Sequence, residues 1–268
     1  MSNTSKIIDT CLALSLGALL ASSLGCAATS EAEPDASPPT STETTETATP
    51  EPAPTTERTA VTFHPQLHAY VERLLPTLST IPEDRRETLD RIAAFVRERG
   101  AASLPARLVF ICTHNSRRSH MSQIWAATAA AWYGVDGVET YSGGTEATAF
   151  NPRAVAAMRR AGFEIGEVPD DVANPHYAVS FAGDDTALDA FSKTYDADGN
   201  PREDFAVIMT CSQADQACPF VRGATRRISL PYDDPKLADG SPEEADRYDE
   251  RALQIAGEMF YLFSQVHG

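Results

Sequence analysis

The spacing of apolar residues along the chain changes near residue 107. Between residues 61 and 100 the apolar positions follow the 3.6-residue period of two amphipathic helices, and Gly100 marks the end of the second. From residue 107 onward, short apolar runs alternate with helical patterns. The expected strands are 108–111, 138–142, 205–210 and 227–230, and the expected helices are 119–133, 152–162 and 242–266.

Strands that alternate with helices along a chain pair as a parallel sheet that is covered on both faces. We therefore predict an α/β fold with a four-stranded parallel sheet flanked by helices and preceded by two extra N-terminal helices. The expected boundaries are 59–106 for the N-terminal helical extension and 107–268 for the α/β domain, with a loop-rich insertion at 176–203.

The first 58 residues carry the pattern of a targeting segment followed by a tether. An apolar run of roughly 15 residues, CLALSLGALLASSLGC, is shorter than the ~20 residues that span a membrane and is typical of a signal-peptide core. Its end, with small residues before Cys26, resembles a bacterial lipoprotein signal. We predict a signal peptide at 1–26, lipidation of Cys26, and a disordered acidic tether rich in Thr, Pro and Ala at 27–58.

These features predict a lipoprotein that is anchored to a membrane through Cys26. Its folded part would then lie on the periplasmic or other extracytoplasmic side. Two alternatives remain open: an uncleaved membrane anchor, and a translation start further downstream, which would leave the protein in the cytoplasm.

The charge of the chain limits what it binds. The formal net charge is -16 and the sequence pI is about 4.7, which argues against a nucleic-acid partner, because phosphate backbones are bound by concentrated Lys and Arg. An anionic ligand must therefore be held by a local basic site.

Such a site is indicated in LVFICTHNSRRSHMSQIW, residues 108–125, between an expected strand and an expected helix. The C-x5-R pattern from Cys112 to Arg118 has the length of a loop whose N–H groups surround one tetrahedral oxyanion beside a helix N-terminus. Arg118 would close this cradle, and the same field would lower the thiol pKa of Cys112 and make it a nucleophile. The alternative is a cysteine that is simply buried at a strand end. The expected substrate-binding residues are Thr113, His114, Asn115, Ser116, Arg117, Arg118 and Ser119.

Three candidate catalytic residues are expected at one edge of the sheet. Cys112, Cys211 and Asp234 each lie at or just past the carboxyl end of an expected strand. In open α/β folds, ligands bind at that end of the strands. We therefore expect these three side chains to share one site.

The sequence VFICTHNSRRSHMSQIW resembles the phosphate-binding loop of the low-molecular-weight protein tyrosine phosphatases and of the arsenate reductases that share their fold. The resemblance continues through TYSGGTEATAFNPRAVAAMRRAGFEI, VIMTCSQADQACPF and YDDP, and so covers most of residues 107–266. It implies attack by the Cys112 thiolate on a bound oxyanion, an Asp before Pro as general acid, and no bound cofactor. That acid would be Asp234, with neighbouring Asp233 as the competing candidate.

The cysteine pair in TCSQADQACP favours the arsenate reductase branch. By resemblance, Cys112 attacks arsenate, Cys211 attacks Cys112 and releases arsenite, and Cys218 then displaces Cys112, which leaves a Cys211–Cys218 disulfide. Thioredoxin or a thioredoxin-like protein would reduce that disulfide. The pair could instead be a structural disulfide or a metal pair, although its spacing and the lack of a nearby His do not match zinc sites.

Two other functions stay open. A low-molecular-weight protein tyrosine phosphatase would hydrolyse phosphoesters through a phosphocysteine with Cys112, Arg118 and Asp234, but the tyrosines that usually follow its Asp-Pro are replaced here by Lys236 and Leu237. The third function is that of a non-enzymatic lipoprotein that binds arsenate or phosphate.

Three positions depart from the loop of that family. His114 replaces a glycine that allows an unusual backbone conformation, so it must either accept strain or mark a different loop shape. Arg117 replaces a cysteine, and its charge either attracts the oxyanion or faces solvent. Gln123 stands where the reductases often have an acidic residue, so we do not expect a metal or other cation at the loop.

Overall fold

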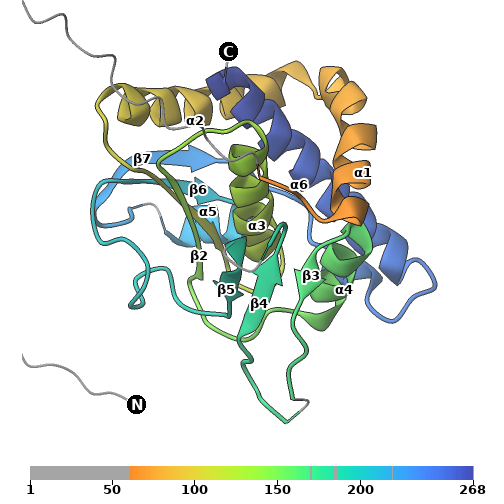
Figure 1. Cartoon of the computed structure of the whole chain (residues 1–268). Helices are drawn as coiled ribbons and strands as arrows, with labels where there is room; N and C mark the ends of the chain where they lie inside the picture. The colour runs from red at the N-terminus through yellow and green to blue at the C-terminus, as the bar shows by residue number, and fades with distance from the viewer. Residues whose placement is uncertain (1–60, 170, 184–185, 219, 268) are drawn as a thin grey trace, which may run out of the picture. The chain divides into compact units, whose positions relative to one another are not determined.

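The centre of the protein is a four-stranded parallel sheet (Figure 1). The computed structural model describes residues 61–169, 171–183, 186–218 and 220–267. The strands lie in the order β2-β1-β6-β7, and they are β1 (Ala106–Cys112), β2 (Val138–Gly144), β6 (Phe205–Met209) and β7 (Ala224–Ser229). The predicted α/β fold is confirmed. The expected signal peptide, the expected tether and Cys26 lie outside the described residues.

Helices cover both faces of the sheet, as the alternating pattern predicted. One face packs against α2, α3 and α6, and the other packs against the short α5. The helices are α1 (Pro65–Leu74), η1 (Leu75–Thr80), α2 (Glu83–Ala101), α3 (Arg118–Trp132), α4 (Pro152–Ala161), α5 (Ser212–Ala217), η3 (Pro235–Ala238) and α6 (Glu244–His267).

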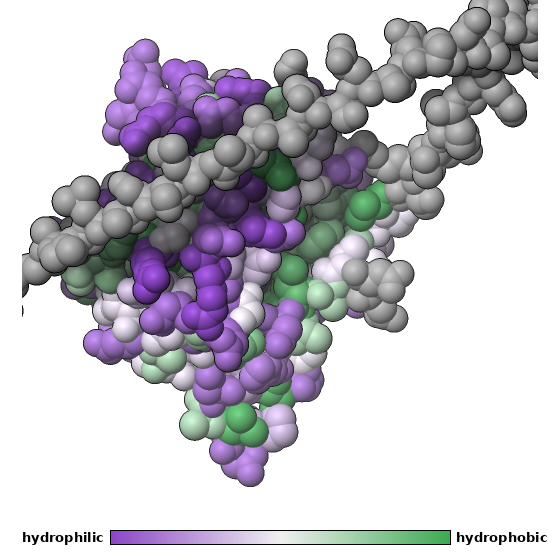
Figure 2. All heavy atoms as spheres, turned by 90° about the vertical axis from the view of Figure 1, so that its left-hand side faces the viewer, coloured by the Kyte–Doolittle hydropathy of each residue, from purple (hydrophilic) through white to green (hydrophobic). Residues whose placement is uncertain are grey.

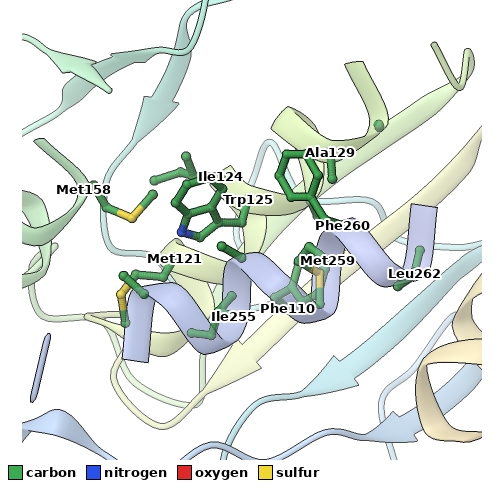
Figure 3. Packing of buried hydrophobic residues seen from close by; sticks show 14 of the residues in the cluster. Phe110, Met121, Ile124, Trp125, Ala129, Met158, Ile255, Met259, Phe260 and Leu262 are labelled. Carbon is green, nitrogen blue, oxygen red and sulfur yellow. The ribbon is translucent and has the colours of Figure 1, made fainter. Parts of the chain in front are cut away.

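Successive residues of the central strands enter two separate apolar clusters, because side chains alternate across a strand. Phe110 of β1 joins the larger cluster, where Figure 3 shows it with Trp125 of α3 and Phe260 of α6. Each of these side chains is fully buried, and burial of one such side chain contributes roughly 1.5–3 kcal/mol. Ile111 of β1 points the other way into the smaller cluster, which also contains Cys112.

The N-terminal helices are part of the larger cluster. Leu67 of α1 and Ile92 of α2 are fully buried, and both helices contact α6. Arg85 of α2 reinforces this packing with two hydrogen bonds to the buried carboxylate of Glu258 on α6, at 2.9 and 2.5 Å. The first and last helices of the described chain therefore complete one core.

Local sequence signals set the bounds of α4. The side chain of Asn151 accepts a hydrogen bond from the main-chain N of Arg153 at 3.0 Å, which caps the helix start, and Pro152 occupies the first turn. Gly162 ends the helix in the left-handed conformation at φ 106°. Both bounds agree with the expected ones.

A small antiparallel sheet has two of its strands in the stretch expected to be loop-rich and its third strand just before that stretch. Its strands are β3 (Glu164–Ile165), β4 (Tyr177–Ser180) and β5 (Leu188–Ala190), in the order β3-β4-β5. Strands of two to four residues are too short to show the alternation that identifies a strand in sequence. The helix α5 was also not predicted, because six residues are too few to show a helical period in the sequence.

The surface in Figure 2 mixes hydrophilic side chains with scattered apolar ones. Two strongly exposed apolar side chains follow candidate site residues in the chain: Phe220 after Cys218, and Leu237 after Asp234. Among the described residues, no helix is both long and apolar enough to cross a membrane.

Candidate active site

The loop between β1 and α3 lies at the carboxyl end of the sheet, as predicted. Its shape depends on Asn115, which has a φ of 43°, and on Gly144 of the neighbouring β2. A Cβ on Gly144 would lie 2.7 Å from the main-chain N of Asn115 and 2.8 Å from the carbonyl O of Thr113, so a glycine is required there. The left-handed residue of the loop is therefore Asn115 and not His114, and asparagine tolerates that conformation better than most residues.

A chain of hydrogen bonds leads to the sulfur of Cys112. The main-chain N–H of Lys193 donates to Asn115 Oδ1 at 2.9 Å, which fixes the orientation of the amide because an N–H cannot accept. Asn115 Nδ2 then donates to Ser119 Oγ at 2.9 Å, and Ser119 Oγ lies 3.1 Å from Cys112 Sγ. When Cys112 is a thiolate it can only accept, so the Ser119 hydroxyl is then the donor of this pair. This arrangement stabilises negative charge on Cys112.

The loop supplies donors for an oxyanion. Within the described residues, the main-chain N–H groups of 114–117 make no hydrogen bond to a protein acceptor, and the N-terminus of α3 follows directly. Arg118 is buried, and its Nη1 and Nη2 donate to Tyr232 O at 3.0 Å and to Asp234 Oδ2 at 2.7 Å. Its Nε is buried without an acceptor among the described residues. These free donors are what a tetrahedral anion requires.

Asp234 and Asp233 occupy different environments. Asp234 is mostly buried, contacts Arg118, and accepts a hydrogen bond from the main-chain N of Lys236 at 3.1 Å. The side chain of Asp233 is 94% exposed and lies 3.6 Å from Arg251. The geometry therefore favours Asp234 over Asp233 as the residue that acts at the loop.

Arg117 does not face solvent, so that alternative is wrong. Only 11% of its side chain is exposed. Its Nε donates to the Tyr248 hydroxyl at 2.8 Å, and the guanidinium lies 3.7 Å from Asp239 and 4.0 Å from Asp234. Arg117 thus connects α6 to the loop that carries Asp234, and its positive charge stays close to the anion site.

The insertion at 176–203 holds the loop from outside. Ser192 donates to the carbonyl of His114 at 3.0 Å, in addition to the Lys193 contact described above. The imidazole of His114 itself is half exposed and lies 3.6 Å from Glu146. Sequence reasoning missed Ser192 and Lys193, because they contact the loop from about 78 positions away and carry no motif.

Ser116 and Thr113 were also expected to bind substrate. Ser116 is held through its main-chain carbonyl, and Thr113 makes a contact through its hydroxyl. The carbonyl of Ser116 accepts from the main-chain N of Asn151 at 2.8 Å, which ties the loop to the start of α4. Thr113 Oγ1 lies 3.4 Å from Cys211 Sγ. The loop residue that follows the candidate nucleophile therefore contacts the second cysteine directly.

The second and third cysteines flank α5. Cys211 is buried, and its sulfur accepts from the main-chain N of Ala214 at 3.4 Å as the N-terminal cap of this helix. Cys218 is the C-terminal cap and is partly exposed. Cys112, Cys211 and Cys218 are all free thiols in the described structure and pack in or against the smaller apolar cluster.

His120 is a buried ionisable group behind the loop. Its ring packs against Phe150, with 4.4 Å between ring centroids, and its Nδ1 lies 3.2 Å from Ser142 Oγ. Burial, with a smaller effect of the nearby Lys193 charge, lowers the pKa of His120 to about 3. The side chain is therefore neutral in the folded protein at ordinary pH.

We expect this histidine to make the protein less stable in mild acid. The unfolded chain takes up a proton at His120 as the pH falls below about 6.5, whereas the folded chain does so only near pH 3. Between pH 6.5 and pH 5 the folded state therefore loses about 2 kcal/mol from this residue. Urea unfolding at pH 7 and pH 5 measures the loss, and His120→Gln should remove that component. Identical pH dependence in the two proteins would contradict the assignment.

Comparison with known proteins gives a family for this arrangement. A profile of the family described as "Low molecular weight phosphotyrosine protein phosphatase" matches residues 107–180. An arsenate reductase of Bacillus licheniformis is 31% identical over 159 residues, which span 59% of this chain and 95% of that protein.

Two solved structures are also similar. A low molecular weight protein tyrosine phosphatase from T. tengcongensis has 16% identity and a TM-score of 0.41, and the match covers 59% of this chain and 98% of that chain. A thioredoxin-dependent arsenate reductase of Corynebacterium glutamicum has 17% identity and a TM-score of 0.33, over 70% of this chain and 92% of that chain. On the profile match and the Bacillus relative, the chain belongs to the low molecular weight phosphotyrosine protein phosphatase family and, within it, is similar to arsenate reductases.

Proposed function

We propose that this protein is an arsenate reductase that works through Cys112, Cys211 and Cys218. The observation that carries the proposal is the contact between Thr113 Oγ1 and Cys211 Sγ, which places a second free thiol against the loop of the first. A phosphatase reaction uses one cysteine, and a reductase needs a route for two electrons. The name of the Bacillus relative agrees with this choice.

In the first step, arsenate binds in the loop against the N–H groups of 114–117 and Arg118. The Cys112 thiolate attacks the arsenic(V) atom, and one arsenate oxygen leaves as water after Asp234 supplies a proton. The product is a bond between Cys112 Sγ and arsenic(V). The Ser119 hydroxyl, 3.1 Å from the sulfur, stabilises the attacking thiolate.

In the second step, the thiolate of Cys211 attacks Cys112 Sγ. A disulfide forms between the two sulfurs, the bond from sulfur to arsenic breaks, and its electron pair leaves with arsenic as arsenite. Two thiols have then been oxidised and one arsenic(V) has been reduced to arsenic(III). Cys218 next attacks Cys211 Sγ, which releases the Cys112 thiolate and leaves a Cys211–Cys218 disulfide.

The last exchange requires α5 to unfold. Cys211 and Cys218 cap opposite ends of this helix, so their Cα atoms are about 10 Å apart from the helical rise of 1.5 Å per residue. A disulfide requires a Cα separation of about 4.4–6.8 Å. A six-residue helix is short enough to unwind, because isolated helices of this length are not stable.

The resulting disulfide needs a dithiol reductant, and we propose a thioredoxin-like protein as this partner. Cys218 is the more exposed cysteine of the pair and is therefore the sulfur that an external thiolate reaches. We also propose, from the sequence alone, that a lipid on Cys26 anchors the protein outside the cytoplasm. In that case the reductant would be exported as well.

Replacing Cys218 with serine tests the relay. With arsenate, thioredoxin, thioredoxin reductase and NADPH, the parent should oxidise NADPH continuously. The variant should release a single arsenite per protein molecule and then stop with a Cys112–Cys211 disulfide, which peptide mapping by mass spectrometry identifies. Cys211→Ser should stop before arsenite release. Continuous arsenate turnover by either variant would rule out this relay.

The second candidate function is phosphoester hydrolysis, for which Asp234 lies beside Arg118 at the loop. Cys112, Arg118 and Asp234 are sufficient for it, and it leaves Cys211 and Cys218 without a chemical role. In this case para-nitrophenyl phosphate is hydrolysed equally by the parent and by Cys218→Ser, and no NADPH is consumed with arsenate. The same set of proteins therefore distinguishes the two functions.

A further inference from the structure

We propose that Arg227 is a positioning residue that holds the Cys218 end of α5 and thereby opposes closure of the Cys211–Cys218 disulfide. The proposal rests on the proposed function, because it concerns the last exchange of the relay. It concerns a residue of β7 that belongs to neither the loop nor the cysteine pair.

The contacts of Arg227 converge on the end of α5. Its Nε and Nη2 donate to the carbonyl of Cys218 at 3.2 and 3.1 Å, and Nη2 also donates to the carbonyl of Asp215 at 2.6 Å. The same Nη2 lies 2.5 Å from the Asp215 carboxylate. Ser229, two residues along β7 on the same face, donates to the other oxygen of Asp215 at 2.8 Å. Carbonyls at a helix C-terminus lack partners within the helix, so these bonds stabilise that end directly.

The two ends of α5 are held by different means. At the start, Cys211 Sγ accepts the N–H of Ala214. When Cys211 forms its bond with Cys112, this sulfur moves to a new partner, and the cap at the start of the helix is lost. Arg227 and Asp215 then hold α5 from the other end. Cys218 approaches Cys211 only after its carbonyl leaves Arg227.

The contacts of Arg227 are made in the dithiol form and must break in the disulfide form. They therefore stabilise the reduced pair, and they shift the equilibrium of the pair with any thiol reagent toward the thiols. If the contacts of Arg227 are lost, the Cys211–Cys218 disulfide should form more readily and become harder to reduce. A merely structural role of Arg227 would change thermal stability without moving this equilibrium.

The chain offers a matched control in Arg226, the preceding residue. Side chains alternate across a strand, so Arg226 points to the opposite face of β7, where it lies 3.1 Å from Glu98 of α2. It is also an arginine in an ion pair, and it makes no contact with α5 in the described structure. Arg226→Met and Arg227→Met therefore remove the same chemical group from the two faces of one strand.

The experiment equilibrates the full chain, with Cys112 replaced by serine, in buffers of reduced and oxidised glutathione. One oxidised glutathione converts the two thiols into the disulfide and yields two reduced glutathiones. Peptide mapping quantifies the Cys211–Cys218 disulfide. We expect Arg227→Met to shift the equilibrium about tenfold toward the disulfide, equal to about 30 mV in reduction potential. Arg227→Lys should shift it less, and Arg226→Met should leave it unchanged.

A second measurement needs no disulfide. Hydrogen exchange of the reduced chain should be at least about fivefold faster over residues 212–218 in Arg227→Met than in Arg226→Met. Equal exchange and equal equilibria in the two variants would overturn the proposal. If the disulfide forms in neither protein, the relay of the proposed function fails. In that case the exchange rates alone decide whether Arg227 holds α5.

Discussion

Replacing Cys112 with serine should lower the turnover of arsenate and of para-nitrophenyl phosphate by roughly 10⁴-fold or more, because it removes the nucleophile of both reactions. A serine hydroxyl in the same place stays protonated at neutral pH and cannot give electrons to arsenic. The site around it should stay intact, because the side chains are of similar size and Ser119 remains at hydrogen-bond distance. Steady-state assays with both substrates measure the effect.

Two observations separate this loss from a loss of structure. Thermal unfolding of Cys112→Ser should match that of the parent, and the variant should still bind arsenate, as titration calorimetry can detect. Cys218→Ser is the second comparison, since it should keep the hydrolysis of para-nitrophenyl phosphate while losing continuous arsenate reduction. Arsenate turnover that survives in Cys112→Ser would show that another residue starts the reaction.

Arg85→Gln should lower the free energy of unfolding by about 3–5 kcal/mol, the usual effect of breaking a buried ion pair from one side. Glu258 is 2% exposed, and Arg85 is its charged partner through two hydrogen bonds. Without Arg85 the carboxylate stays buried beside Tyr232, whose hydroxyl donates to it at 2.7 Å, with no compensating positive charge at that distance. Urea unfolding at pH 7 measures the change.

The control for Arg85 is the exposed pair Arg247 and Glu250 on α6. Both side chains are more than half exposed, so Arg247→Gln should lower the free energy of unfolding much less than Arg85→Gln does. Similar losses in the two variants would show that burial does not set the contribution of the Arg85 pair. Arg85 also donates to the carbonyl of Pro231, and the carbonyl of the next residue, Tyr232, accepts from Arg118. The activity of Arg85→Gln at low temperature therefore tests whether this contact positions Arg118.

The parts of the fold that could be predicted are those with long local patterns. The four strands of the central sheet are runs of five to seven residues, and α4 carries a capping residue at Asn151 and a stop at Gly162. The antiparallel strands and α5 could not be predicted, because their few residues are held by distant contacts. Arg227, for example, stabilises α5 from β7, and nothing in the sequence near α5 indicates this.

The site shows the same division. The loop, Arg118 and the position of Asp234 at the strand ends could be predicted, because a motif and a topology rule apply to them. For His114 the sequence left two alternatives, strain or a different loop shape, and the positive φ of the loop lies at the next residue, Asn115. The burial of Arg117 depends on Tyr248 and Asp239, which lie more than 100 positions away in sequence. Such contacts are set by the packing of α6 and not by local sequence.

The packing of α1 and α2 against α6 bears on how the chain folds during synthesis. Arg85 and Glu258 are separated by 173 positions, and α6 contacts both N-terminal helices. Domains usually fold as units as the chain leaves the ribosome, at about 5–20 residues per second. Here the apolar faces of α1 and α2 stay partly uncovered until α6 emerges, so the nascent chain should depend on chaperones until that point.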